Sequence, residues 1–102
     1  MILRDIAHVR TGDKGDTSQI AIFAYRAEDY PLLVEHVTAE RVARHLASLT
    51  CRAIRRYELP NLHAVNLVLE GALDGGVTRS LALDAHGKTL GAQLLDLEVY
   101  PQ

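Results

Sequence analysis

The chain has no tryptophan, one phenylalanine and one cysteine among its 102 residues. The lone Cys51 excludes an internal disulfide bond and is compatible with a reducing compartment. The aromatic residues are four tyrosines and one phenylalanine, which do not form a stacking platform for nucleic-acid bases. No apolar run approaches the roughly 20 residues that a membrane-spanning helix needs. We therefore expect a cytoplasmic protein that binds neither nucleic acid nor membrane.

A strong excess of one charge is also missing. The chain has 11 lysine and arginine residues against 13 aspartate and glutamate residues, a net charge of −2. This balance provides no general attraction to nucleic acid or to an anionic membrane. The hydrophobic content of 48% and the length suit one soluble domain, residues 1–102, with one modest core. The five histidines show no metal-ligand spacing, so we expect no metal site, and we assign no cofactor.

The most informative segment is the polar stretch at residues 10–18, between two apolar runs. Its glycines, Gly12 and Gly15, tolerate unusual backbone angles, so we expect a tight loop with several N–H groups turned the same way. Such a nest of amides suits an anionic group, whereas the aspartates would favour a cation or orient the basic side chains. An ordered connection whose aspartates cap backbone amides is the alternative. The candidate ligand-binding residues of this segment are Arg10, Gly12, Asp13, Lys14, Gly15, Asp16 and Ser18.

A second candidate site lies at residues 75–80. A helix beginning near Val77 would present free N–H groups, beside Arg79, to a phosphate or carboxylate, and a flexible connection with a surface arginine is the alternative. Asn66 lies in an apolar strand, where an unpaired buried amide costs roughly 1–3 kcal/mol, so it either reaches the glycine loop or faces solvent. If the basic residues of both sites converge, they would accommodate the phosphates of a CoA thioester. The candidate residues added here are Asn66, Gly76, Arg79, Ser80 and Lys88.

The apolar pattern predicts two strands, a long helix, two more strands, a second helix and a last strand. The strand at residues 19–25 is apolar on both sides, and we expect it to be covered on both faces. Helical sequence starts at Tyr30, and Thr38 is the predicted N-cap of an amphipathic helix that continues to Leu49. An antiparallel sheet with helices on one face, a ferredoxin-like α+β sandwich, is the economical arrangement. The other strands are predicted at residues 2–9, 51–58, 64–69 and 95–99, and the second helix within 75–94.

Five motifs follow one another along the chain. They are RTGDKGD at 10–16, TAERV at 38–42, YELPNL at 57–62, GGVTRSL at 75–81 and LDAHGK at 83–88. Together they resemble the small C-terminal domain of the acyclic terpene utilisation protein A (AtuA) family. The resemblance covers nearly the whole chain and implies a ferredoxin-like fold. Thr11 stands where the family motif usually has serine, a change that keeps the hydroxyl group.

The resemblance also implies a metabolic setting. The AtuA family is associated with the bacterial breakdown of acyclic isoprenoids through acyl-CoA intermediates. In that family a large N-terminal domain normally precedes the small one. A chain with the small domain alone is therefore expected to be a detached subunit or an accessory module that pairs with an AtuA-type large subunit.

Three hypotheses of function follow. The first is a non-catalytic accessory or ligand-binding domain that pairs with the large subunit, binds a CoA-type ligand and self-associates through an exposed sheet face or strand edge. The second is a small hydratase- or lyase-like enzyme acting on a CoA thioester, with His8 or Asp84 as the proton-transfer group. The third is a purely structural dimerisation module.

Overall fold

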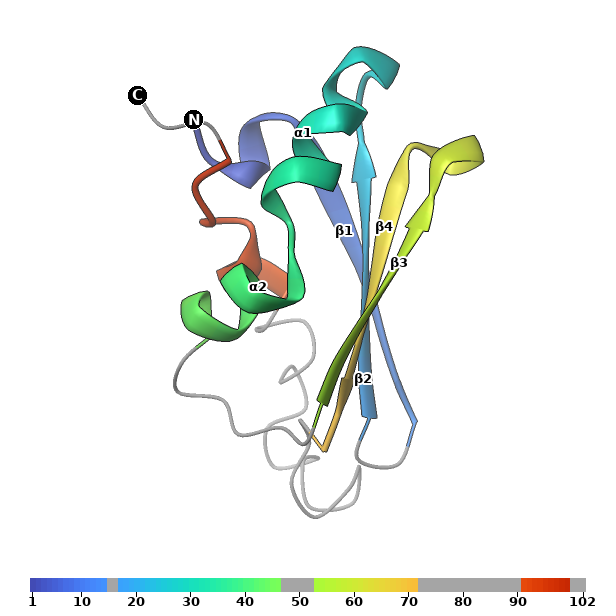
Figure 1. Ribbon diagram of the computed structural model, residues 1–102, viewed down its shortest axis with the longest axis vertical. Helices are drawn as coiled ribbons and strands as arrows, with labels where there is room; N and C mark the ends of the chain where they lie inside the picture. The colour runs from blue at the N-terminus through green and yellow to red at the C-terminus, as the bar shows by residue number, and fades with distance from the viewer. Residues whose placement is uncertain (15–16, 47–52, 72–90, 100–102) are drawn as a thin grey trace.

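The computed structural model describes residues 1–14, 17–46, 53–71 and 91–99. Its scaffold is a sheet of four antiparallel strands. The strands are β1 (Ala7–Lys14), β2 (Thr17–Ala24), β3 (Ala53–Leu59) and β4 (Ala64–Glu70). They lie in the order β1-β2-β4-β3, so β2 and β4 are central and β1 and β3 form the edges (Figure 1). Strands that follow one another in the sequence pair as hairpins, β1 with β2 and β3 with β4.

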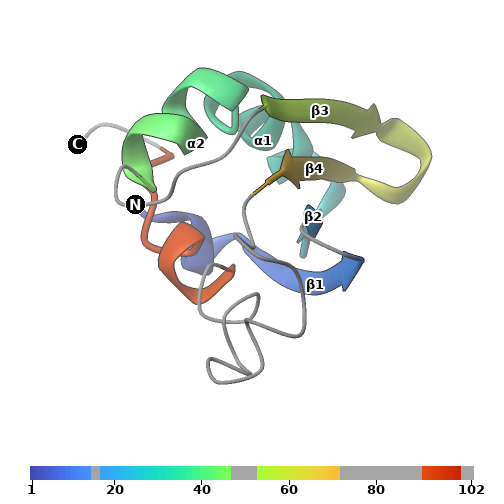
Figure 2. The same ribbon diagram turned by 90° about the horizontal axis from the view of Figure 1, so that it is seen from below.

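Two short helices, α1 (Tyr30–His36) and α2 (Ala39–His45), cover one face of this sheet. Both lie on the same side of the strands when the sheet is viewed along its strands (Figure 2). This arrangement confirms the predicted antiparallel sheet with helices on one face and the ferredoxin-like α+β fold class. Three-residue 3-10 helices lie at Leu3–Asp5, Ala27–Asp29 and Pro60–Leu62.

The helical sequence predicted from Tyr30 forms two helices, with a break at Val37 and the predicted restart at Thr38. Thr38 is the N-cap of α2, as predicted, because its Oγ1 accepts a hydrogen bond from the Arg41 backbone N–H at 3.2 Å. The break lets both helices direct an apolar side chain into the core. Leu33 of α1 and Val42 of α2 are both fully buried.

The hydrophobic core lies between the helices and the covered face of the sheet. In the central strand pair, Ile20 lies opposite Leu67 and Ile22 lies opposite Val65, and all four side chains are fully buried. They belong to one buried cluster with Leu33. A shift of register by one residue would move this set to the exposed face. Because full burial of each aliphatic side chain contributes about 1.5–3 kcal/mol, the loss strongly disfavours such a shift.

The chain enters the sheet later than predicted. Residues 3–5 form a 3-10 helix instead of the start of a strand, and β1 begins at Ala7. Leu3 and Ile6 are both buried, and this spacing of three suits a helical turn better than strand alternation. The Leu3 N–H donates to the Leu97 carbonyl at 2.8 Å, which bonds the turn to the C-terminal segment.

The predicted strand at residues 95–99 does not join the sheet. Residues 91–94 are helical, and the segment after them makes one isolated antiparallel bridge, between Ile2 and Glu98. Burial alternates along residues 95–99, as expected for extended chain, but their backbone bonds to the N-terminal segment, where the Val99 N–H donates to the Met1 carbonyl at 3.0 Å. The buried residues of this segment are Leu94, Leu97 and Val99.

The described residues include residues 91–94 of the second predicted helix, whereas its earlier part, residues 75–90, lies outside them. The first two residues of the predicted strand at 51–58 also lie outside them, and β3 begins at Ala53. The ranges that the structure describes contain no helix long and apolar enough to span a membrane.

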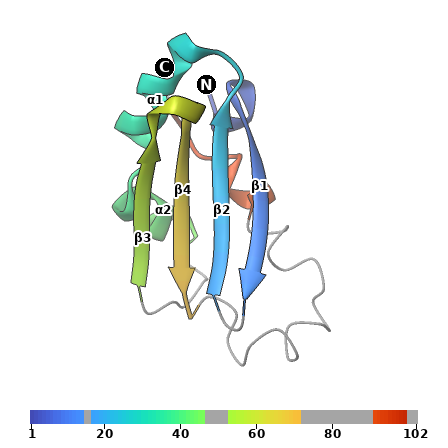
Figure 3. The same ribbon diagram turned by 90° about the vertical axis from the view of Figure 1, so that its right-hand side faces the viewer.

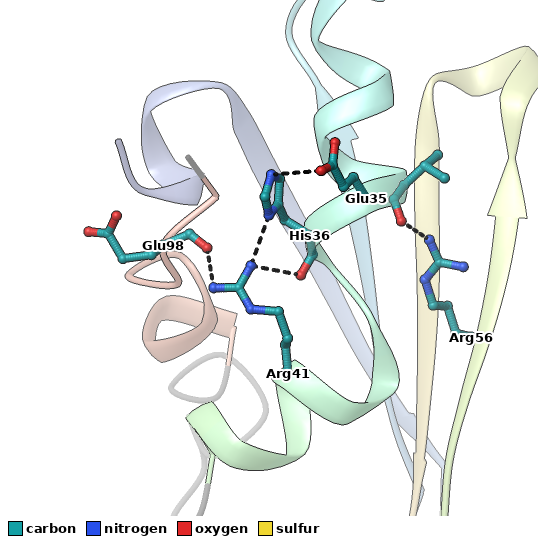
Figure 4. A network of polar contacts seen from close by, with 6 residues as sticks. Glu35, His36, Arg41, Arg56 and Glu98 are labelled. Carbon is teal, nitrogen blue, oxygen red and sulfur yellow. Dashed lines mark hydrogen bonds and ion pairs between the residues drawn. The ribbon is translucent and has the colours of Figure 1, made fainter. Parts of the chain in front are cut away.

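Arg56, on β3, bonds the sheet to the end of α1 (Figure 4). Its Nε donates to the Val37 carbonyl at 2.6 Å, and a terminal nitrogen donates to the Val34 carbonyl at 2.8 Å. The last carbonyls of a helix have no partner inside the helix, so the guanidinium satisfies groups that would otherwise need water. Arg56 also pairs with Glu58 at 2.8 Å.

Arg41, on α2, makes a second set of bonds, to α1 and to the C-terminal segment (Figure 4). One of its terminal nitrogens donates to the His36 carbonyl at 3.3 Å and to the His36 Nδ1 at 3.1 Å. The other donates to the Glu98 carbonyl at 2.6 Å. Both helices and the C-terminal segment are therefore joined through one side chain.

Arg56→Ala is expected to lower the free energy of unfolding by about 1.5–3 kcal/mol, because hydrogen bonds from a charged donor are lost and two carbonyls lose their partner. The Arg56 side chain is 19% exposed, whereas the side chain of its neighbour Arg55 is 58% exposed. Arg55→Ala is therefore the matched control, with an unfolding midpoint close to that of the wild type. Urea denaturation followed by circular dichroism measures both, and equal midpoints for the two variants would contradict the role of Arg56.

Gly91 approaches the covered face of β1 so closely that a side chain would not fit. A Cβ at this buried glycine would lie 2.8 Å from Cγ2 of Thr11 and 3.2 Å from Cγ2 of Val9. Gly91→Ala is therefore expected to destabilise the fold by about 1–3 kcal/mol through overpacking. At Gly12 a Cβ would meet nothing within 4 Å, so Gly12→Ala should leave stability unchanged or raise it slightly. Thermal unfolding of the two variants tests this order, and a reversed order would show that the close approach is absent.

Candidate functional site: the open face of the sheet

The face of the sheet opposite the helices has no covering layer among the described residues (Figure 3). The expectation that the strand at 19–25 is covered on both faces is therefore wrong. Ile20 and Ile22 are fully buried, whereas Gln19 is exposed and Ala21 and Phe23 are half-buried. Strand alternation and register assign the following residues to this surface, here called the open face: His8, Arg10, Gly12, Gln19, Ala21, Phe23, Arg55, Tyr57, Asn66, Val68 and Glu70. Tyr25 follows β2 and belongs to the same surface because its ring stacks on His8.

One row of the open face crosses all four strands. Arg10 lies opposite Ala21, Ala21 lies opposite Asn66, and Asn66 lies opposite Tyr57. Neighbouring strands are about 4.8 Å apart, so Arg10 and Asn66 flank the small Ala21 from its two sides. The guanidinium of Arg10 and the amide of Asn66 therefore lie on either side of Ala21, whose side chain is a single methyl group.

A stack of three rings lies next to this row. The His8 ring is stacked on Phe23 with a centroid distance of 5.3 Å and an interplanar angle of 14°. The same ring is stacked on Tyr25 at 5.3 Å and 28°. Rings at such distances attract one another, so the three side chains form a pre-packed surface instead of three mobile groups.

The two arginines of the open face differ in their partners. The Nε of Arg55 donates to Oε2 of Glu70 at 2.5 Å, and this hydrogen bond and the charge of Glu70 raise the pKa of the Arg55 guanidinium. Arg10 is exposed and has no carboxylate partner among the residues that the structure describes. Arg10 is therefore the open-face arginine whose charge is available to a ligand or partner.

Residues 1–100 match the family of the AtuA ferredoxin-like domain. The chain belongs to this family. The match extends over nearly the whole chain and confirms the resemblance carried by the five sequence motifs. The comparisons with curated proteins and with solved structures found no match.

In this AtuA ferredoxin-like domain, the first motif is mostly paired strand and not the loop predicted at residues 10–18. β1 continues to Lys14, which lies opposite Thr17, the first residue of β2. Gly12 lies opposite Gln19 in the ladder and does not have a positive φ. The predicted nest of amides is therefore wrong for these residues, because successive N–H groups of an extended strand point in opposite directions and cannot converge on one anion.

The structure separates the predicted binding residues of this motif. Arg10 and Gly12 lie on the open face with Asn66, so that part of the predicted set is brought together. Ser18 is fully buried on the covered face, and its Oγ has no hydrogen-bond partner among the described residues. Because successive side chains of a strand point to opposite faces, Ser18 and Arg10 do not share a site.

The remaining candidates have no described side chain. Asp13 and Lys14 are the last residues of β1, with their backbones paired to β2. The convergence of the two predicted sites therefore stays a prediction. The candidates that lie outside the described residues are Gly15, Asp16, Gly76, Arg79, Ser80, Asp84 and Lys88.

A hollow of about 390 Å³ lies at the C-terminal end of α2, on the helix side of the protein. Asp96, in its lining, accepts a hydrogen bond from Arg4 at 3.0 Å. The Nε2 of His45 donates to the Gln93 carbonyl at 2.7 Å. These hydrogen bonds join α2 and the N-terminal turn to the C-terminal segment. Most polar groups that line the hollow therefore already have a partner within the protein. Within the described ranges, no group of three or more metal-ligating side chains occurs.

The aromatic residues of the open face were missed by sequence reasoning. Phe23 and Tyr25 are two residues apart, a spacing that places both on one side of a strand, and this signal is visible in the sequence. Their stacking on His8 follows from the pairing of His8 with Phe23, which no local pattern specifies. Tyr57 reaches the same face through a strand that is more than 30 residues away in the chain.

Proposed function

We propose that this domain is a non-catalytic accessory module that docks on an AtuA-type large subunit through its open face. Its setting is the breakdown of acyclic isoprenoids through acyl-CoA intermediates. The observation that carries the proposal is a sheet covered by helices on one side, with exposed aromatic rings on the other.

The open face has the composition of an interaction surface. Tyr25 is 63% exposed, Tyr57 is 49% exposed, and Phe23, which stacks on the same His8 ring as Tyr25, is half-buried. Clustered apolar surface of this kind marks protein interaction sites, and tyrosine and phenylalanine are enriched there. A second protein layer on this face would bury the rings as the helices bury the aliphatic side chains of the covered face.

A CoA-type ligand is the second candidate for the same surface. The exposed Arg10 has no acid partner among the described residues and would donate hydrogen bonds to a phosphate. The hydratase or lyase hypothesis finds less support there, because a proton-transfer group needs an orienting partner. No described residue forms a hydrogen bond with the His8 ring, which is stacked on Phe23 and on Tyr25.

Co-expression of the domain with an AtuA-type large subunit tests the docking proposal. We expect co-purification of the wild type, and an affinity at least about tenfold lower for the double variant Tyr25→Ser/Tyr57→Ser, because buried tyrosines carry much of an interface's energy. Leu62→Ser is the control, since Leu62 is 59% exposed but lies in the 3-10 helix after β3. Size-exclusion chromatography and calorimetry measure the complexes.

Two results would contradict the proposal. One is a wild-type chain that does not associate with the large subunit, or a double variant that binds as tightly as Leu62→Ser. The other is turnover of a CoA thioester by the isolated chain, which would favour the enzyme hypothesis.

A further inference from the structure

Charge is distributed unevenly between the open face and the rest of the protein. The chain as a whole has a net charge of −2. On the open face, Arg55 and Glu70 form an ion pair and leave Arg10 as the unbalanced charge of the described residues. The surface offered to a partner is therefore positive although the protein is acidic.

The surroundings of Arg10 suit a carboxylate. Ala21 lies opposite Arg10, and Gly12 is the next residue on the same face of β1. Neither has a side chain beyond Cβ, and the space above Gly12 is open because a Cβ there would meet nothing within 4 Å. An incoming group can therefore approach the sheet beside the guanidinium without displacing protein atoms.

Amides border the same position. Asn66 lies on the far side of Ala21, and Gln19 lies opposite Gly12. Each carries an NH₂ group that donates hydrogen bonds, and a guanidinium binds a carboxylate through two parallel N–H donors. The three side chains supply donors from three directions around one small area.

We propose that the open face recognises an acidic patch on the large subunit, with a carboxylate of that patch bound by Arg10 and bordered by Asn66 and Gln19. The stack of His8, Phe23 and Tyr25 then makes the apolar contact beside it. This inference rests on the proposed docking function and adds the chemistry of the partner.

A second copy of the chain is the wrong occupant for this face. Two open faces brought together would each present an unbalanced Arg10, and the described acid of that surface, Glu70, is already paired with Arg55. Like charges facing one another across an interface oppose association, whereas an acidic partner speeds encounter and fixes its orientation. Charge complementarity therefore selects an acidic protein surface.

Charge reversal at Arg10 tests the inference in the complex of the full chain with the large subunit. We expect the Kd of Arg10→Glu to rise by at least about tenfold and that of Arg10→Gln to rise less, because the neutral variant loses attraction without adding repulsion. Arg44→Glu is the matched control, an exposed arginine on α2 on the helix side, with a Kd within about twofold of wild type. Circular dichroism verifies that each variant is folded. Added salt should weaken the wild-type complex and change that of Arg10→Gln much less.

Each outcome decides the matter. A wild-type complex that Arg10→Glu leaves intact, or that Arg44→Glu weakens equally, would overturn this inference and leave the docking function standing. An absence of any wild-type complex would overturn both. Free CoA that binds the isolated chain through Arg10 would identify a small anion as the occupant, and a wild-type dimer that Arg10→Glu dissociates would identify a second copy; either would overturn the inference.

Discussion

Burial of one side of the β2–β4 pair beneath α1 and α2 is the interaction on which the rest of this structure depends. Ile20 and Leu67 face each other across the central strands, and Leu33 and Val42 reach the same core from the two helices. Isolated helices of seven residues are not stable in water, so α1 and α2 depend on this apolar contact and on the side chains that complete their ends. Both helices lie on the same side of the sheet, so among the described residues the other side has no covering layer. The open face is thus a consequence of how the core is built.

Two adjacent arginines on β3, Arg55 and Arg56, have different roles because their side chains lie on opposite faces of the sheet. Arg56 points to the covered side and gives its donors to the carbonyls at the end of α1, so its charge serves the fold. Arg55 points to the open side, where Glu70 neutralises it. The charge left for recognition is that of Arg10, on the opposite edge strand. Because successive side chains of a strand point to opposite faces, Arg56 stabilises the fold whereas its neighbour Arg55 lies on the surface.

Membership of the AtuA ferredoxin-like family and the geometry of the open face support the functional proposal in different ways. The family match shows which type of domain this is, whereas the large partner and the acyl-CoA setting belong to the proposal. The geometry supplies a physical means of association, with rings packed in advance around His8 and, as the next residue on the same face of β1, an Arg10 without a carboxylate partner among the described residues. Pre-packed rings lose little conformational freedom on binding, which favours association without a large conformational change.

Local pattern by itself determined the two central strands, the fold class and the N-cap at Thr38, because alternation and capping depend on residues close together in the chain. The same reasoning failed at residues 10–18 and at 95–99. Pairing with β2 drew the first segment into the sheet, and contact with the N-terminal turn kept the second out of it. Only the tertiary structure decided which face is covered, that Ser18 is buried away from the candidate site, and that Arg10 and Asn66 flank Ala21. These features arise from contacts between segments far apart in the sequence, whose energies no short stretch of residues contains.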